Sequence, residues 1–308
     1  MRRKREHETH REVRRAERRA RRIAAGAGAA LGASVVFAPI AQAATFEVDT
    51  TDDEPDDGAC LDDDCTLREA VNDADQSSGD DVVTFAAGLS GEIDLVDGDI
   101  NIGGDGGVEI QGPGADVLAI DGQDDQRIFK ITGFPVPNEQ VVISGLTLTG
   151  GNESDPTSDS GGAIRSFGTI DPGTLYEYPA DLTVRDSVLT DNETGDDGGA
   201  IYNEPVYVFG SGDYYSGGLT IQGSVITDNE AGDDGGAIDS RSNGYGPVAI
   251  TDSVISGNRA NYVGGVRLDD LEEPATITRS TVSNNIAVGS NAGGIGVSSY
   301  EETAGLTI

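Results

Sequence analysis

Tryptophan is absent from this chain of 308 residues, and histidine, cysteine and methionine are nearly so. The two histidines, His7 and His10, and the single methionine, Met1, all lie within the first ten residues. A structural zinc site needs four cysteine or histidine ligands, and the rest of the chain cannot supply them. Cys60 and Cys65 stand five positions apart and are expected to form one local disulfide if the chain is exported.

Basic residues are also scarce outside the first 22 positions, which hold 11 of the 20 lysines and arginines. An apolar stretch rich in alanine and glycine follows over residues 23–40, and Ala41–Ala43 (AQA) fits the small-x-small pattern of a cleavage site. Residues 1–43 are therefore predicted to be a bacterial signal peptide that sends the chain to the cell surface or the extracellular space. An uncleaved membrane anchor is the alternative, and both the general secretory and the twin-arginine routes stay open.

Positive charge is nearly missing from the remainder of the chain. Beyond residue 43 there are nine basic and 51 acidic residues, a formal net charge of −42. Such a surface repels nucleic acid and anionic lipid, and it favours a monomer. No segment there is apolar enough to predict a membrane span. The charge suits salty or calcium-rich extracellular surroundings, and solubility alone is the other explanation.

What the chain does contain is a repeated phrase. Four copies align without gaps: LTVRDSVLTDN (182–192), LTIQGSVITDN (219–229), VAITDSVISGN (248–258) and ATITRSTVSNN (275–285). A looser copy occupies 141–152. Glycine pairs alternate with these phrases, 37, 37, 29 and 29 residues apart, and begin at Gly161, Gly198, Gly235, Gly264 and Gly293. A repeat of this length with alternating aliphatic residues predicts a solenoid of short strands.

The repeats predict an all-β fold, a right-handed parallel β-helix, over residues 81–308. Equal positions in successive coils would lie one above another at about 4.8 Å, the spacing of paired strands. The asparagines that close the phrases would then form a ladder of Asn192, Asn229, Asn258 and Asn285. Leu306–Ile308 reads as the start of another repeat without a polar final cap, so we expect a C-terminal truncation; a partner that covers this end is the alternative.

Residues 44–80 are predicted to form an N-terminal cap. TFEVDT indicates a first strand, an acidic loop holds both cysteines, and TLREAVNDAD indicates a short helix. Thr66 and Glu69 have the spacing of a capping box, and the apolar residues of 67–74 fall on one helical face. The helix is therefore expected to cover the open end of the first coil.

Two segments carry a resemblance to known families. Cys65–Val71 (CTLREAV) resembles the CSLREA-type N-terminal module of secreted bacterial β-helix proteins, and residues 108–131 resemble the coil that commonly follows it. The glycine pairs, alternating with aliphatic-x-x-Asn, are similar to the GGAI/FxxN repeats of chlamydial polymorphic outer-membrane protein adhesins, although the phenylalanine is aliphatic here. The resemblance implies the pectin-lyase-like fold, which hosts lyases, hydrolases and adhesins.

Two nearly identical acidic turns, TDNETGDDGG (190–199) and TDNEAGDDGG (227–236), stand 37 residues apart. Stacked coils would place Asp191 over Asp228, Asp196 over Asp233 and Asp197 over Asp234. Stacked like charges repel, and Ca²⁺, which prefers oxygen ligands, would reverse that penalty. These six aspartates are the predicted calcium site, with solvated turns that hold no ion as the alternative.

Tyrosines gather in insertions that follow the glycine-pair strands. The candidate positions are Tyr176, Tyr178, Tyr207, Tyr214, Tyr215 and Tyr245. The two main insertions leave neighbouring coils on one side, and loops on a rigid scaffold are where recognition concentrates. Because tyrosine offers a flat face to sugars and an amphipathic anchor to proteins, we predict a binding face for a polysaccharide or a cell-surface protein. Tyrosines that only pack on one another are the alternative.

No catalytic residue can be assigned. Asp186 and Asp252 share a repeat position, but they are two coils apart, about 9–10 Å, the loose limit for an inverting carboxylate pair. Arg165, Arg241 and Arg267 follow the glycine pairs at different offsets, which favours salt bridges. The sequence therefore predicts an adhesin-like binding module. A polysaccharide lyase or hydrolase of the same fold, and a structural spacer for a missing C-terminal domain, are the alternatives.

Overall fold

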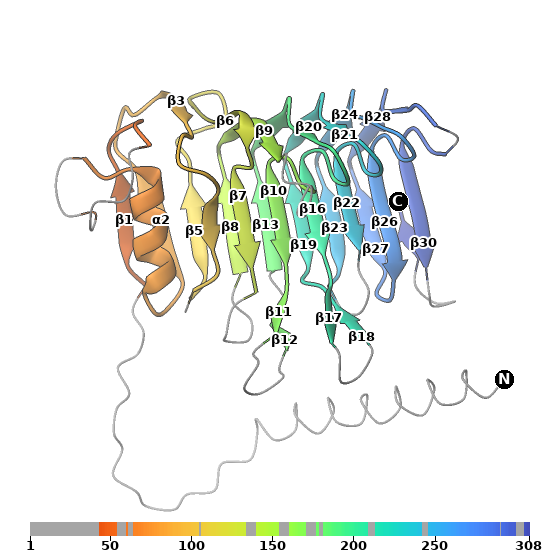
Figure 1. The fold of residues 1–308 in the computed structure, drawn as a ribbon, viewed down its shortest axis with the longest axis horizontal. Coiled ribbons are helices and arrows are strands. Elements are labelled where there is room, and N and C mark those ends of the chain that lie inside the picture. The colour runs from red at the N-terminus through yellow and green to blue at the C-terminus, as the bar shows by residue number, and fades with distance from the viewer. Residues whose placement is uncertain are drawn as a thin grey trace, which may run out of the picture. The chain divides into compact units, whose positions relative to one another are not determined.

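Parallel strands, stacked coil on coil, make up most of this computed structural model (Figure 1). The described residues are 43–53, 60, 64–104, 106–133, 140–153, 160–170, 177–178, 181–208, 213–241, 246–289, 291–299 and 305–308. They all belong to one compact unit, Ala41–Ile308. Apart from Ala43, the predicted signal peptide lies outside the described residues.

Sheet A has nine parallel strands in order along the coils. They are β1 (Thr45–Val48), β2 (Asp81–Phe85), β5 (Val108–Gln111), β8 (Gln140–Ser144), β13 (Asp181–Arg185), β19 (Leu219–Gln222), β23 (Val248–Thr251), β27 (Ala275–Thr278) and β31 (Leu306–Thr307). Sheet C has seven: β4 (Ile100–Ile102), β7 (Phe129–Thr132), β10 (Ile164–Phe167), β16 (Ile201–Glu204), β22 (Ile238–Arg241), β26 (Val266–Leu271) and β30 (Ile295–Ser299).

Between sheets A and C the chain passes through sheet B and then through a narrow sheet D. Sheet B holds β3 (Gly91–Asp94), β6 (Leu118–Gln126), β9 (Thr147–Glu153), β14 (Val188–Thr190), β20 (Val225–Thr227), β24 (Val254–Ser256) and β28 (Thr281–Ser283). Sheet D holds the end of β9 with β15 (Glu193–Thr194), β21 (Glu230–Ala231), β25 (Arg259–Ala260) and β29 (Ile286–Ala287). The coils thus run A, B, C, with a strand of sheet D between B and C from β9 onward, which confirms the predicted parallel β-helix.

Aliphatic side chains fill the inside of the coils in columns. In sheet A, Ile143, Val184, Ile221 and Ile250 are aligned by the strand register, and all four are fully buried. Burying one such side chain contributes roughly 1.5–3 kcal/mol, so each coil gains its core by stacking on its neighbours.

The predicted asparagine ladder is present at the corner between sheets B and D. Asn192 Nδ2 donates to Asn229 Oδ1 at 2.8 Å, and Asn229 and Asn258 repeat this bond to the next rung at 2.9 Å. Each Nδ2 also donates to a carbonyl of the preceding coil. The serines of the repeats form a second ladder, in which a backbone N–H donates to the hydroxyl of the next serine. Side chains therefore satisfy the buried backbone groups of both turns.

The glycine pairs allow the coils to approach closely. Gly235 has φ +62°, a left-handed conformation that glycine adopts without strain. A Cβ on Gly236 would lie 2.3 Å from the carbonyl oxygen of Gly264 in the next coil. The inward residue is the fourth of GGAI, as at Ile238, and the third of GGVR, as at Val266, because these two are paired in register.

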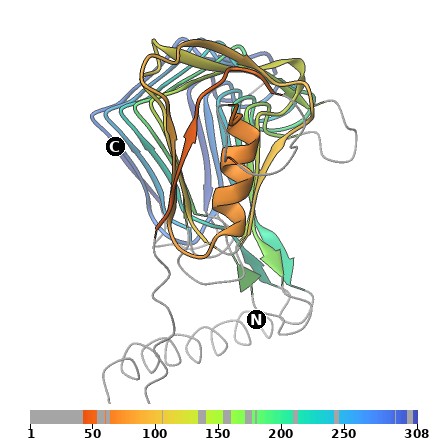
Figure 2. The ribbon, with the colours of Figure 1, turned by 90° about the vertical axis from the view of Figure 1, so that its left-hand side faces the viewer.

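Helix α2 (Leu67–Gln76) lies across the end of the first coils (Figure 2). Its predicted capping box is present, with Thr66 and Glu69 bonded to each other's backbone N–H. Arg68 ties the helix to the first coil, because its guanidinium binds both carboxylate oxygens of Asp53 at 2.9 Å and donates to the carbonyls of Gly98 and Asp99. The residue thus has a structural role.

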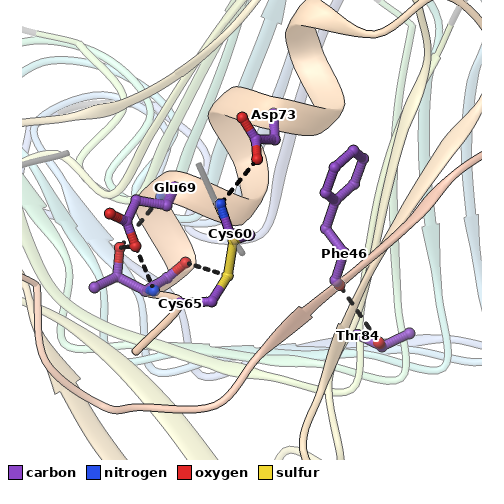
Figure 3. Close-up of a disulfide and its surroundings, with 7 residues drawn as sticks. Phe46, Cys60, Cys65, Glu69, Asp73 and Thr84 are labelled. Carbon is purple, nitrogen blue, oxygen red and sulfur yellow. Dashed lines mark hydrogen bonds between the residues drawn. A yellow bond between two sulfur atoms is a disulfide. The ribbon is translucent and has the colours of Figure 1, made fainter. Parts of the chain in front are cut away.

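The predicted disulfide joins Cys60 and Cys65 at the start of this helix (Figure 3). The backbone N–H of Cys60 donates to Asp73 at 3.1 Å, and Cys65 precedes the N-cap residue Thr66. The crosslink and this hydrogen bond therefore tie Cys60 to the helix. Among the described residues, no helix is both long enough and apolar enough to cross a membrane.

Candidate functional site

Two antiparallel hairpins extend from neighbouring coils at the corner between sheets C and A. They are β11 (Thr169–Ile170) with β12 (Glu177–Tyr178), and β17 (Val206–Val208) with β18 (Asp213–Tyr215). Strands β11 and β17 contact each other, and both hairpins project on the same side of the sheets in Figure 1. We call these two elements the hairpin pair.

The hairpin pair brings together four of the six tyrosine positions predicted to bind a ligand. Tyr207 lies opposite Tyr214 in the register of the second hairpin, where Val206 lies opposite Tyr215. Tyr178 belongs to β12 of the first hairpin. Tyr176 and Tyr245 lie outside the described residues.

The two acidic turns are stacked as predicted. The backbone N–H of Asp233 donates to the carbonyl of Asp196 at 2.8 Å, and that of Asp234 donates to the carboxylate of Asp197 at 3.1 Å. Gly198 N–H donates in turn to the carbonyl of Asp234. The four aspartates of the two DDGG segments therefore lie together beside sheet C.

Asp191 and Asp228 do not join them. Both are exposed at left-handed turn positions, and each accepts a hydrogen bond from the threonine before it, at 2.8 and 2.9 Å. Among the described residues, neither belongs to a group of carboxylates close enough to share an ion. The six predicted ligands thus fall into two places, since the asparagine corner and sheet D separate them.

Asp239 is the site residue that sequence reasoning missed. It occupies an outward position of β22, aligned with Tyr202 in β16 and with Arg267 in β26. Although this position faces away from the core, its side chain is fully buried. Carboxylate oxygens of Asp197, Asp234 and Asp239 lie within 4.8 Å of one another.

Two arginines neutralise most of this charge. Arg241 pairs with Asp197, and its Nε lies 3.5 Å from Oδ1 of Asp239. Arg267 contacts Asp234 at 3.0 Å and Asp239 at 3.2 Å. We call Asp197, Asp234, Asp239, Arg241 and Arg267 the Asp–Arg cluster. Asp269 also pairs with Arg267, at 2.6 Å, so carboxyl groups outnumber the two guanidinium groups here, and the charges do not balance if every carboxyl group is ionised.

The three carboxyl groups of the cluster have raised pKa values. Burial raises the pKa of Asp239 to about 7, and the charge of Asp197 adds to the effect; together they outweigh the attraction of Arg241 and Arg267. Burial also raises the pKa of Asp197 to about 6 and shifts the pKa of Asp234 upward. The carboxyl groups of the cluster are therefore harder to ionise than a solvated aspartate.

Because of these two arginines, calcium is not needed to offset the repulsion between Asp197 and Asp234. Stacking of Asp197 and Asp234 needs no cation, because each has a guanidinium partner. A second trio, Asp196, Asp197 and Asp233, has carboxylate oxygens within 4.8 Å of one another, and two of its members lie at or near the surface. This trio can hold a metal ion, with water completing the coordination.

The predicted use of the three arginines in salt bridges is confirmed. Arg165 pairs with Glu204 at 2.5 Å, while Arg241 and Arg267 pair within the cluster. Arg165 and Arg267 moreover share one outward column of sheet C, with Tyr202 and Asp239 between them. The residue directly after each GGAI thus carries the polar chemistry of this face, a signal present in the sequence.

Asp186 and Asp252 are not a catalytic pair. Arg279 donates two hydrogen bonds of 2.6 Å to Asp252, and these bonds lower the pKa of that carboxyl group. A general acid needs the opposite shift. Raised values occur instead in the Asp–Arg cluster, where the side chain of Asp239 is fully buried and Asp197 is only 4% exposed.

No protein-family model, curated protein or solved structure matches the chain.

Proposed function

We propose that the chain is an exported, adhesin-like binding module that recognises glycans on a cell or matrix surface. Its resemblance to CSLREA-type secreted proteins and the signal-peptide pattern of residues 1–43 support export. The observation that carries the binding role is the hairpin pair, because two adjacent insertions place tyrosine positions together beside a rigid scaffold. Tyrosine suits this role since it offers large contact area at low entropic cost.

Replacing Tyr207, Tyr214 and Tyr215 with alanine should abolish binding to a glycan array and leave the thermal midpoint unchanged. The reason is that strands β17 and β18 pair with each other in a two-stranded sheet and belong to none of the stacked sheets of the coils. Tyr262→Ala is the matched control, since Tyr262 is 39% exposed and belongs to no hairpin. If the triple variant binds the array as well as the unmodified protein does, the hairpin pair is not the binding face. Binding to cells but to no glycan would assign the face to a protein partner.

We further propose that Ca²⁺ binds at Asp196, Asp197 and Asp233 and stabilises two adjacent coils. Three carboxylates with water as the remaining ligands resemble weak extracellular sites, for which Kd is about 10⁻⁴–10⁻³ M. The thermal midpoint should therefore rise in millimolar Ca²⁺, by roughly 2–4 °C for a gain of about 1 kcal/mol.

The double variant Asp196→Asn with Asp233→Asn should lose this response to calcium. Asp191→Asn with Asp228→Asn is the control and should keep it, because those residues lie apart from the trio. Mg²⁺ should be less effective, since it gives up its water ligands reluctantly. If neither added calcium nor chelation changes the thermal midpoint, calcium does not bind at this trio.

One observation favours the alternative of a polysaccharide lyase or hydrolase. Carboxyl groups with raised pKa values, close to further carboxylates, are what general acid catalysis of glycoside cleavage uses. The burial of these groups weighs against it, because a substrate cannot touch Asp239 in this arrangement. Release of reducing or unsaturated sugar ends by the purified protein would place catalysis ahead of binding.

A further inference from the structure

Asp81 is an acidic residue at a core position of the first coils. In strand β2 the buried residues Asp81 and Val83 alternate with the half-buried Val82, so the side chain of Asp81 faces the interior. The aligned positions in the next five strands of sheet A are aliphatic and buried: Val108, Val141, Leu182, Leu219 and Val248. A charge buried in such a column is costly unless it is paired.

One oxygen of this carboxyl group has a partner and the other has none. Oδ1 accepts a hydrogen bond of 2.5 Å from the backbone N–H of Ala44, directly before strand β1. Oδ2 is buried and has no hydrogen-bond partner among the described residues. The two residues are held in place, because the N–H of Val82 donates to the carbonyl of Ala44 at 3.0 Å. The N–H of Asp81 donates in turn to the carbonyl of Gly107 at 2.8 Å.

The basic side chains of the neighbouring elements are bound elsewhere. Arg68 of helix α2 pairs with Asp53, and Arg185 of sheet A pairs with Glu109. Within the described part of the chain, no lysine or arginine pairs with Asp81. The other acidic groups around it are exposed or accept from backbone N–H groups: Glu47, Asp73, Asp75 and Asp80. What remains as a source of positive charge is the atom already bonded to Asp81, the backbone nitrogen of Ala44.

Cleavage at the predicted signal-peptide site would turn that nitrogen into a cation. Hydrolysis of the Ala43–Ala44 bond by a signal peptidase consumes one water. The carbonyl carbon of Ala43 gains the hydroxyl and becomes a carboxylate, while the nitrogen of Ala44 gains protons and becomes an ammonium group. Ala43 is exposed, and a free amino terminus, with a pKa of about 7.7–8.0, is mostly charged at neutral pH.

We infer that removal of residues 1–43 frees the amino group of Ala44 to form an ion pair with Asp81, so that processing completes the first coil. The inference rests on the export part of the proposed function, since it needs cleavage directly after Ala43. An ammonium group has three donors where the peptide nitrogen has one, so it can keep the bond to Oδ1 and also serve Oδ2. The first coil is therefore less stable before cleavage than after it.

The first test compares two cleaved forms of the full chain that differ by one residue. A site for a protease that leaves no residue of its own is inserted directly before Ala44 or, in the matched control, directly before Ala43. Cleavage before Ala44 should raise the thermal midpoint by at least about 5 °C, because a buried carboxylate gains a charged partner. Cleavage before Ala43 should not, since its amino group lies one residue away, about 3.8 Å, at an exposed position.

Asp81→Asn separates the charge from the hydrogen bond. Asparagine keeps an acceptor for the N–H of Ala44 and loses the negative charge. In this variant, cleavage before Ala44 and cleavage before Ala43 should therefore give the same thermal midpoint. If cleavage before Ala44 raises the midpoint of the variant as much as that of the unmodified chain, Asp81 is not the partner and the inference is overturned.

A second measurement follows the amino group itself and does not need the Asp81→Asn variant to fold. Lys130 is the sole lysine after residue 43, so trace acetylation with acetic anhydride labels two amines in each cleaved form. Only the unprotonated amine reacts, and an ion pair favours the protonated form. At pH 8 the amino terminus should react at least about tenfold more slowly in the form that begins at Ala44 than in the form that begins at Ala43. Lys130 should react equally in both.

N-terminal sequencing of the chain exported by a bacterial host completes the test. A first residue of Ala44 supports the processing step, and any other first residue overturns it. Equal thermal midpoints of the two cleaved forms, or equal labelling rates of their amino termini, would overturn the ion pair. Glycan binding by the hairpin pair enters none of these measurements. Failure of the proposed binding role, of export processing and of the ion pair are therefore told apart.

Discussion

Asn229→Ala should destabilise the protein by roughly 3–5 kcal/mol, because each buried polar group that loses its partner costs about 1–3 kcal/mol. Asn229 is 1% exposed. Its Nδ2 donates to the carbonyls of Leu189 and Thr227 and to Asn258, and its Oδ1 accepts two bonds from Asn192. Alanine removes all of these bonds and leaves groups of three coils unpaired. The measurement is the free energy of unfolding in urea, followed by circular dichroism.

Asn285→Ala is the control within the same ladder. Asn285 is the last rung of the described ladder and partly exposed; its side chain accepts from Asn258 and donates to the carbonyl of Ile255. Its loss should cost about 1–2 kcal/mol, since water can replace the missing partners. Equal stability of the two variants would show that the ladder does not hold the coils together.

Gly236→Ala should cost at least about 3 kcal/mol or prevent folding, at the upper end of the range for overpacked cores. An added Cβ would lie 2.3 Å from the carbonyl oxygen of Gly264 and 2.5 Å from that of Arg259. Both atoms are backbone, and neither can rotate away. The next coil would have to separate along sheets C and D, which breaks hydrogen bonds on both sides of the turn.

Gly218→Ala tests whether any added methyl group has this effect. There the nearest atoms to a Cβ are 3.4 Å away, an ordinary contact, and one is the side-chain oxygen of Asp181. We expect a change within about 1 kcal/mol, as for most surface substitutions. If Gly236→Ala were as mild, close approach of backbones would not explain the glycine pairs.

Periodicity predicted the scaffold well, because stacking turns sequence spacing directly into position. Asn192 and Asn229 are 37 residues apart and hydrogen-bonded, and Asp196 lies against Asp233 as their shared phrase implies. Thr66 and Glu69 form the expected capping box because a helix start is decided locally. Features set by the spacing of the repeats, or by the residues of a single helical turn, can therefore be predicted from the sequence.

The sequence analysis missed the Asp–Arg cluster for a physical reason, although the position after each GGAI gives a partial signal. Alternation indicates that Asp239 faces outward, and an outward aspartate is expected to be solvated. Its burial depends on groups from three different segments, among them Asp197 and Arg267, whose offsets from the glycine pairs differ. The shift between GGAI and GGVR brings Arg267 into the column of Asp239. A gap-free comparison of repeats hides that alignment.

The coils differ in length at one corner. Glycine pairs are 37 residues apart where a hairpin follows sheet C and 29 apart where β26 leads directly to β27, yet the strands before and after stay in register. Extra chain at this corner thus leaves the stacking interface untouched. Loops of different length can therefore be inserted or deleted there without loss of the stacking contacts, so that one framework can carry different hairpins while its interior stays the same.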